Sequence, residues 1–231
     1  MDTQKLEWEK SYRKLDNFVF YPHEEVIRFV SKNIRKRVGL GEFRDVVSCA
    51  TQAKVLDLGC GIGRHVIYCH DMGLDAYGVD LSQYAVDRAV EWAKIRGVAH
   101  ADEKIVQGDI RKLPWKDGYF DFAVSHGVLD SMHFEIARAA CQELRRVMKE
   151  GGLFYCDLVS GDDSGHAREY CGEELVENLH EQGTVQSYFN IGKIQELFYG
   201  FFEIDEALLV RRENVLAGGY SSRHHLALRS I

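Results

Sequence analysis

The sequence predicts an α/β protein, built on a doubly wound, mostly parallel seven-stranded sheet that ends in a C-terminal antiparallel hairpin. Two observations predict this class. Between residues 54 and 160, strand-like apolar segments alternate with amphipathic helical segments, an order typical of a parallel sheet with helices on both faces. The last two strand-like segments, 202–213 and 223–230, are joined by a short glycine-containing connection, so we expect them to pair with each other.

Each element follows from apolar spacing and from the residues that start or end helices. Residues 22–38 place apolar side chains at helical spacing. A second helix is expected from Ser82, which caps it, to Gly97, and a third over 136–147, closed by a Gly-Gly pair. The expected strands are, in chain order, 54–59, 75–81, 103–109, 120–127, 152–160, 202–213 and 223–230. No repeat or linker-like tract occurs, so residues 1–231 are predicted to form a single domain.

Composition and charge argue against several classes of protein. The chain of 231 residues is 45% hydrophobic, enough for a full core, and its net charge of −7 argues against a nucleic-acid partner. No run of about 18 uncharged apolar residues occurs, and the first residues lack a signal-peptide core. We therefore expect a cytoplasmic location and no membrane partner. The six cysteines, at positions 49, 60, 69, 141, 156 and 171, form no C-x-x-C pair, which favours buried free thiols and no metal.

The stretch KVLDLGCGIGRHV places a glycine turn between a strand and a helix. Gly59, Gly61 and Gly63 follow Asp57 in a D-x-G-x-G-x-G pattern. Such a turn brings backbone N–H groups at a helix N-terminus close to a ligand. A dinucleotide site would have a third small residue where Arg64 stands, which disfavours a dinucleotide-dependent oxidoreductase. An aspartate at the end of the strand instead suits a ligand with a cationic amine, such as the methionine part of S-adenosylmethionine.

Acids also follow the next two strands. Asp80 ends the second strand, where a carboxylate can accept both ribose hydroxyls, and Asp109 comes at the end of the third, near the expected place of an adenine amino group. Arg64, in the first turn after the glycines, is a candidate partner for the methionine carboxylate. This pattern fits the rule that open α/β sheets bind ligands at the carboxyl ends of their strands.

Five motifs, spread in order over about residues 53–160, resemble those of class I S-adenosylmethionine-dependent methyltransferases. They are VLDLGCGIGRH, GVDLS, GDIRKLPWKDGYFD, VSHGVLDSM and ELRRVMKEGGLFYCDL, and their style resembles the small-molecule branch. The resemblance implies a Rossmann-like methyltransferase fold, an enzyme, and S-adenosylmethionine as its cofactor. It implies the following cofactor-binding residues: Asp57, Gly59, Cys60, Gly61, Gly63, Arg64, Asp80, Leu81, Asp109, Ile110, Ser125 and His126. The signatures of DNA-base methylation, Asn-Pro-Pro-Tyr and Pro-Cys, are absent.

Histidines are the candidate catalytic bases. Methyl transfer needs chiefly alignment and exclusion of water, and a base is required only where the acceptor must lose a proton. His126 follows the fourth strand and has the best position, with a packing role beside the cofactor as the alternative. His166 lies in an insertion over 161–189, which we expect on the acceptor side. The insertion is rich in carboxylates, and if it overhangs the site it favours a cationic or neutral polar acceptor.

Aromatic residues precede the first strand, where this family often has a lid. Residues 1–50 are therefore expected to form an N-terminal helical lid with Tyr12 and Tyr21, and Tyr188 is expected to add an aromatic wall for the acceptor. The predicted activity is methyl transfer to an oxygen or nitrogen of a small polar metabolite, such as a sugar or natural-product intermediate, by a monomer or homodimer. The alternatives are a protein or RNA methyltransferase and a catalytically silent, cofactor-binding partner subunit.

Overall fold

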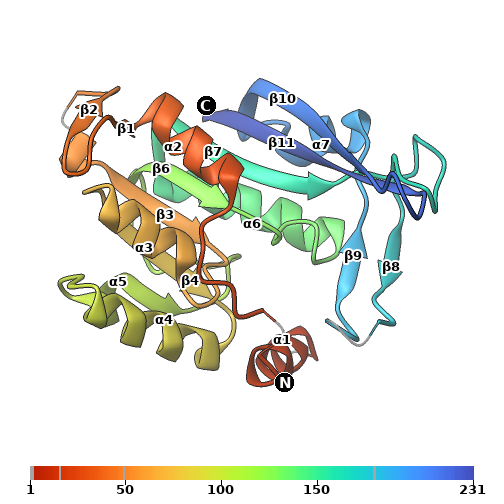
Figure 1. Ribbon diagram of the computed structural model, residues 1–231, viewed down its shortest axis with the longest axis horizontal. Coiled ribbons are helices and arrows are strands. Elements are labelled where there is room, and N and C mark those ends of the chain that lie inside the picture. Colours follow the sequence, from red (N-terminus) through yellow and green to blue (C-terminus); the bar gives the residue numbers. More distant parts are fainter. Residues whose placement is uncertain (1–2, 16, 49, 179–180) are drawn as a thin grey trace.

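A seven-stranded sheet in the order β10-β11-β7-β6-β3-β4-β5 forms the centre of the computed structural model, which describes residues 3–15, 17–48, 50–178 and 181–231 (Figure 1). Its strands are β3 (Lys54–Leu58), β4 (Asp75–Asp80), β5 (Ile105–Gln107), β6 (Phe120–Ser125), β7 (Met148–Val159), β10 (Phe202–Glu213) and β11 (Tyr220–Ser230). β11 runs antiparallel to β10 and β7, and the other neighbours pair in parallel. This confirms the predicted class, including the C-terminal hairpin.

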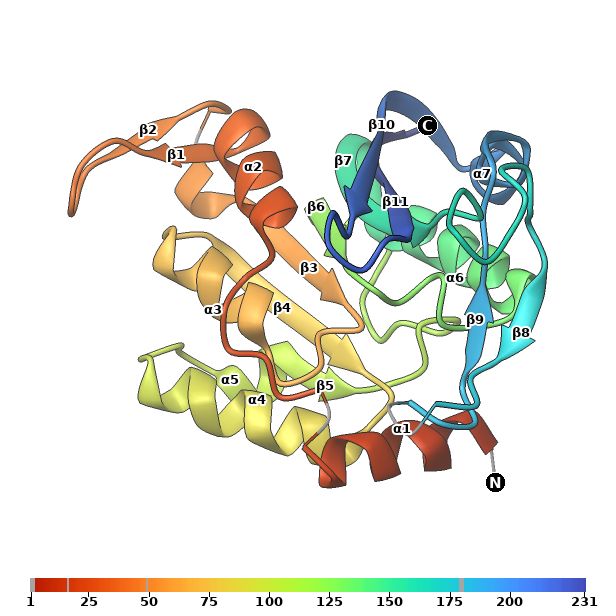
Figure 2. The same ribbon diagram turned by 45° about the vertical axis from the view of Figure 1, so that its right-hand side comes forward.

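Helices cover both faces of the sheet and bury two apolar clusters against it (Figure 2). One face carries α2 (Glu24–Asn33), α3 (Arg64–Asp71) and α4 (Gln83–Ile95), and the other carries α6 (Phe134–Val147) and α7 (Ile191–Phe198). Helix α4 begins as predicted, because the Ser82 hydroxyl accepts a hydrogen bond from the Ala85 N–H at 3.2 Å. Because the central strands are apolar and covered by helices on both faces, the ends of the strands are what the sheet leaves open to a ligand.

The first predicted helix is too long at its C-terminal end. Helix α2 ends at Asn33, and β1 (Arg35–Arg37) then pairs with β2 (Phe43–Asp45) in a separate two-stranded sheet. The carbonyl of the buried Ile34 accepts hydrogen bonds from the N–H groups of Val46 and Val47, at 2.9 and 3.3 Å. These bonds replace the helical ones and turn the chain into the hairpin.

Two further boundaries differ from the prediction. The short helix α5 (Ala101–Lys104) takes up the start of the expected third strand, so β5 ends two residues before Asp109. The Gly-Gly pair expected to close α6 lies inside β7, because the helix ends at Val147. Gly152 is required there, since a Cβ at this position would come within 2.8 Å of the Asp121 carbonyl oxygen.

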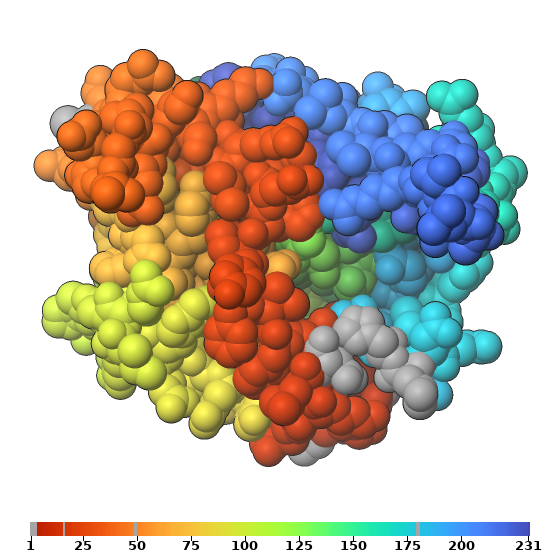
Figure 3. Space-filling model, in the orientation of Figure 1, coloured from red at the N-terminus to blue at the C-terminus, as the bar shows by residue number. Residues whose placement is uncertain are grey.

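The N-terminal segment and the insertion meet near the carboxyl ends of the parallel strands. Helix α1 (Thr3–Arg13) lies beside the free end of the two-stranded sheet of β8 (Glu173–Leu175) and β9 (Val185–Ser187) (Figures 1 and 2). A Cβ at Gly183 would lie 3.3 Å from the Glu7 carboxylate of α1, which confirms that the two segments touch. In Figure 3 the N-terminal segment, in red, crosses the molecule between α3 and α4 on one side and the C-terminal strands on the other.

Cys60, Cys69, Cys141 and Cys156 are buried free thiols, as predicted, Cys171 is exposed, and Cys49 lies outside the described residues. Over the described ranges, no helix combines the length and apolarity needed to span a bilayer.

Candidate cofactor and acceptor site

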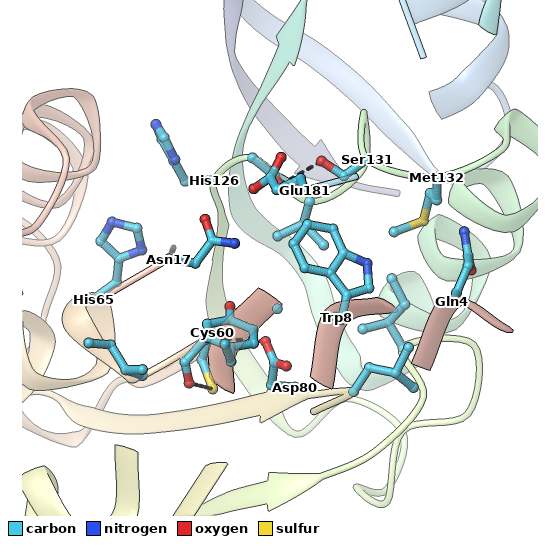
Figure 4. A pocket seen from close by; sticks show the side chains of 18 of the residues that line it. Gln4, Trp8, Asn17, Cys60, His65, Asp80, His126, Ser131, Met132 and Glu181 are labelled. Atoms are coloured by element: carbon cyan, nitrogen blue, oxygen red, sulfur yellow. Dashed lines mark hydrogen bonds between the residues drawn. The ribbon is translucent and has the colours of Figure 1, made fainter. Parts of the chain in front are cut away.

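A cavity of about 280 Å³ lies at the carboxyl ends of β3, β4 and β6, close to the lower limit of about 300 Å³ for small-molecule sites. Loops after these strands form its floor, and α1 with the segment after it forms its roof. In Figure 4, His65 and His126 lie at one end, Gln4 and Met132 at the other, and Trp8 between them. The predicted residues that line it are Gly59, Cys60, Gly61, Arg64, Asp80, Leu81, Asp109, Ile110, His126 and Tyr12.

The other predicted residues do not line this cavity. Asp57 and Ser125 are buried directly behind the floor, at the ends of β3 and β6, and Gly63 precedes α3. Tyr21 is 82% exposed, and Tyr188 lies beside His166 in the insertion. The structure therefore brings nine of the twelve predicted cofactor residues together around the cavity and places these two tyrosines elsewhere.

Two glycines of the loop are required by close contacts as well as by backbone conformation. Gly59 and Gly61 have positive φ values of 74° and 53°. A Cβ on Gly59 would come within 2.5 Å of a Val128 methyl group, and one on Gly61 within 2.6 Å of the Tyr12 hydroxyl oxygen. The loop thus lets α1 and the β6–α6 loop approach the end of β3, which shapes the cavity.

Asp57 is a buried carboxylate without a hydrogen-bond partner. Neither of its oxygens accepts a hydrogen bond from the described residues, and the His65 Nδ1 is 3.6 Å away, too far for one. An unpaired buried charge is costly unless another group completes it. Asp57 therefore fits a ligand that brings a cationic, hydrogen-bond-donating group.

Asp80 is held by backbone N–H groups on both sides. Gly61 N–H donates to Oδ2 at 2.8 Å and Ser82 N–H donates to Oδ1 at 2.9 Å. Burial raises the pKa of Asp80 to about 6, against the lowering effect of these two bonds. Each carboxylate oxygen retains a lone pair, so Asp80 can accept two further hydrogen bonds, as a pair of ribose hydroxyls requires.

Asp109 is already engaged by a neighbouring cation. The Arg111 guanidinium donates to both of its oxygens, at 3.0 Å from Nε and 2.6 Å from Nη2, and the Arg111 N–H donates at 2.8 Å. The Arg111 side chain accordingly holds the pKa of Asp109 below its usual value. Ile110 lies between them and also lines the cavity, so this loop presents an apolar side chain flanked by an ion pair.

His126 has no free lone pair, so the structure does not support its prediction as a general base. Its Nδ1 lies 3.1 Å from Arg64 Nη2, and because a guanidinium only donates, Nδ1 must be the unprotonated nitrogen. The protonated Nε2 then points to Asp157 Oδ2, 3.4 Å away. Burial lowers the pKa of His126 to about 3, despite the opposing charge of Asp157.

A third histidine, His23, packs on His126 behind this end of the cavity and was not predicted. Its ring centroid is 4.0 Å from that of His126, and its backbone N–H donates to His65 Nε2 at 3.3 Å. Burial lowers the pKa of His23 to about 4, so it is neutral near pH 7. Contacts across 42 residues or more leave no local signal in the sequence, which is why His23 and His65 were missed.

Helix α1 is fixed over the cavity by a carboxylate that caps another helix. Glu9 Oε2 accepts hydrogen bonds from the Ser82 hydroxyl at 2.7 Å and from the Tyr84 N–H at 3.2 Å, at the start of α4. This holds Trp8 and the buried Tyr12 above the glycine loop. Of the predicted lid over residues 1–50, α1 with Asn17 and Val19 forms the roof, α2 packs on the sheet, and residues 1–2, 16 and 49 lie outside the described residues.

His166 lies in a paired cluster outside the cavity lining. Its Nδ1 is 2.9 Å from Asp163 Oδ1, its Nε2 is 3.2 Å from Glu174 Oε1, and its ring stacks on Tyr170 at 4.2 Å. The hydrogen bond with Asp163 raises the pKa of His166. From the insertion, Glu181 lines the cavity instead. Among the described residues, no group of three or more His, Cys, Asp or Glu is arranged to hold a metal ion.

Comparison with known proteins agrees with this geometry. The methyltransferase domain family matches residues 56–156. A sterol 24-C-methyltransferase of Gibberella zeae is 35% identical over 135 residues, which cover 54% of this chain and 34% of the relative. The chain spans about a third to a half of the length of the first curated relatives that it matches.

Solved structures share the fold. A S-adenosylmethionine-dependent methyltransferase of Methanosarcina mazei superimposes with a TM-score of 0.65 at 20% identity, covering 78% of this chain and 93% of its own. The 1,6-didemethyltoxoflavin-N1-methyltransferase of Burkholderia thailandensis, solved with 1,6-didemethyltoxoflavin and S-adenosylhomocysteine, gives 0.57 at 21% identity, covering 78% and 71%. Residues 56–156 thus match the methyltransferase domain family, and the chain has the fold of solved S-adenosylmethionine-dependent methyltransferases.

Proposed function

We propose that this chain binds S-adenosylmethionine in the cavity and transfers its methyl group to a small-molecule acceptor. The observation that carries the proposal is the buried, unpaired carboxylate of Asp57 at the end of β3, within a match to the methyltransferase domain family. A cationic amine is the group that such a carboxylate lacks. Relatives named for sterol and toxoflavin-type acceptors support a small molecule as the acceptor class.

The residues around the cavity fit the parts of this cofactor. Asp57 would hold the amine, Arg64 the carboxylate, and Asp80 the ribose hydroxyls. Leu81 and Ile110 would pack on the adenine, with Asp109 at its amino edge. When bound, S-adenosylmethionine supplies a methyl group that its sulfonium has already activated.

The protein then contributes orientation and exclusion of water. Trp8 and Tyr12 roof the cavity, and Val128 closes on the glycine loop. Holding the reactants in one geometry is the main source of acceleration for a transfer of this kind. We infer that the acceptor enters beside these apolar side chains and not through the insertion's charged cluster.

The acceptor atom is proposed to be an oxygen or nitrogen of a small polar metabolite. A neutral amine needs no base, which suits a site where His126 has no free lone pair. A hydroxyl acceptor would need one, and Glu181 is the described cavity-lining carboxylate that remains once Asp80 and Asp109 are assigned to the cofactor. If the Glu181→Gln variant still methylates an amine acceptor, this result would support nitrogen as the acceptor atom. If the variant no longer methylates a hydroxyl acceptor, this result would support oxygen.

Ligand-dependent thermal unfolding tests the cofactor assignment. A ligand at 100 times its Kd stabilises the folded state by about 2.7 kcal/mol, which raises Tm by about 5–10 °C for a chain of this size. S-adenosylmethionine and S-adenosylhomocysteine should produce this shift, and NADH, the control, should not. A shift with NADH alone would contradict the proposal.

A further inference from the structure

Two opposite charges, Arg64 and Asp57, lie at the end of the cavity where we place the cofactor's amino-acid part. Arg64 lines the cavity, and the buried Asp57 is close enough to raise the pKa of the guanidinium, although burial lowers it more strongly. One charge is suited to an ammonium group and the other to a carboxylate. The guanidinium must be held in place, because a long side chain that is free to rotate loses binding free energy when it is ordered.

A chain of fixed groups holds the guanidinium from behind. His126 Nδ1 accepts from Arg64, and its Nε2 faces Asp157. Asp157 is itself held by the Gly127 N–H at 2.7 Å and by Arg223 Nε at 2.7 Å. Arg223 also donates to Asp130 Oδ2 at 2.5 Å. On its far side the imidazole thus faces, without a hydrogen bond, a buried ion-paired network of Asp130, Asp157 and Arg223 that does not line the cavity.

We propose that His126 is a positioning residue, which orients Arg64 toward the carboxylate of the cofactor's amino-acid end. This inference rests on the proposed function, since it assumes that the adenosyl cofactor binds here. It assigns to His126 a part in recognition and none in proton transfer from the acceptor. It also predicts selectivity for ligands that carry the complete amino-acid end.

Calorimetric titration with two ligands tests the inference without turnover. S-adenosylhomocysteine carries the amino-acid end, and 5′-methylthioadenosine is the corresponding thioether without it. His126→Phe keeps a ring but offers no acceptor to Arg64, so affinity for S-adenosylhomocysteine should fall about tenfold or more, as for one charge-assisted hydrogen bond, while affinity for 5′-methylthioadenosine stays unchanged. His126→Gln presents an amide oxygen and an N–H, and should restore most of the loss.

His70→Gln, at the far end of α3, is the matched control and should bind both ligands as the wild type does. A purely structural role for His126 would weaken both ligands equally in His126→Phe, and that result would overturn the inference, as would no change for either. No binding of S-adenosylhomocysteine to the wild type would instead overturn the proposed function, and this inference with it.

Nitrogen NMR of the wild-type imidazoles adds a measurement that needs no variant to fold. The inference requires an unprotonated Nδ1 and a protonated Nε2 on His126 at neutral pH. The opposite tautomer would leave Arg64 without its acceptor and would overturn the assignment.

Discussion

The cavity floor and the insertion differ in whether their charged side chains have hydrogen-bond partners. In the insertion, His166 is paired with Asp163 and Glu174, so the charges satisfy one another. Behind the cavity floor, Asp57 is buried and accepts no hydrogen bond from the described residues. This difference favours binding at the cavity and not in the insertion, because a self-paired cluster stabilises its own segment, whereas a buried charge without a hydrogen-bond partner can be completed by a ligand.

The two candidate histidines illustrate the same contrast. Burial lowers the pKa of His126 to about 3, and hydrogen bonds with carboxylates raise that of His166. The contribution of His126 to the free energy of unfolding is therefore present above its unfolded pKa of about 6.5 and is lost as the pH falls toward 3. That of His166 is present below about 6.5 and is lost as the pH rises through its raised pKa.

Removing the unpaired charge should give the largest effect. Asp57→Asn is expected to weaken S-adenosylhomocysteine binding on the order of 100-fold, because it removes the ionic partner of the amine. The free energy of unfolding should stay equal or rise, since an unpaired buried charge is removed. Calorimetry and denaturant unfolding measure the two quantities. Asp163→Asn in the insertion is the matched control. Equal affinity losses in the two variants would contradict the assignment of Asp57 to the cofactor's amine.

Asp80 should have the next largest effect. Asp80→Ala removes the acceptor for ribose hydroxyls and is expected to weaken S-adenosylhomocysteine about 10- to 100-fold. It also leaves the Gly61 and Ser82 N–H groups without their acceptor, which should lower the free energy of unfolding by about 1–3 kcal/mol. Asp71→Ala removes only a surface ion pair with Arg96 and should leave affinity unchanged. Equal affinities of the two variants would refute the ribose assignment.

The same carboxylate should make cofactor binding depend on pH. With a pKa of about 6, Asp80 is largely protonated at pH 5 and largely ionised at pH 7. Affinity for S-adenosylhomocysteine should therefore fall about tenfold from pH 7 to pH 5. The contribution of Asp80 to the free energy of unfolding has the opposite pH dependence. A carboxyl group whose pKa is raised on folding stabilises the protein at low pH, and this stabilisation is lost as the pH rises through 6. In Asp80→Asn the affinity step between pH 7 and pH 5 should be absent, and a step of unchanged size would assign it to another group.

Substitution of His166 in the insertion should have the smallest effect, and this effect should be confined to the insertion. His166→Gln is expected to leave affinity for S-adenosylhomocysteine unchanged and to speed hydrogen exchange in residues 163–174. In the wild type, exchange there should become relatively faster as the pH rises past the pKa of His166, after correction for intrinsic rates. Hydrogen-exchange mass spectrometry at pH 6 and pH 8 makes both measurements. Lost cofactor binding in this variant would show that the insertion cluster is part of the site.

Much of the fold could be predicted because buried parallel strands are apolar along their length and are followed by polar residues. Strands β3, β4 and β6 are of this kind, and several of the proposed cofactor residues lie at or just after their ends. The hairpin of β1 and β2 could not be predicted, since Arg35–Arg37 continues a helical pattern and only the Ile34 carbonyl, bonded to Val46, shows where the helix stops.

The site could be predicted in part, for a similar reason. Asp57, Asp80 and the glycines stand within a few residues of one another or at equivalent strand ends. Trp8 and Tyr12 reach the cavity from a segment whose position depends on long-range contacts, such as Glu9 with Ser82. The prediction of a base at His126 used its place after β6, whereas the role that we propose for it depends on its contact with Arg64, 62 residues away.

A crystal structure of the chain with S-adenosylhomocysteine would show directly whether Asp57, Arg64 and Asp80 hold the cofactor. We expect the ligand's amino group at the Asp57 carboxylate, its carboxylate at Arg64 with His126 behind, and its ribose hydroxyls at Asp80. The pairs of His166 with Asp163 and Glu174 should be unchanged. A ligand bound elsewhere, or one whose amino-acid end points away from Asp57, would contradict the account.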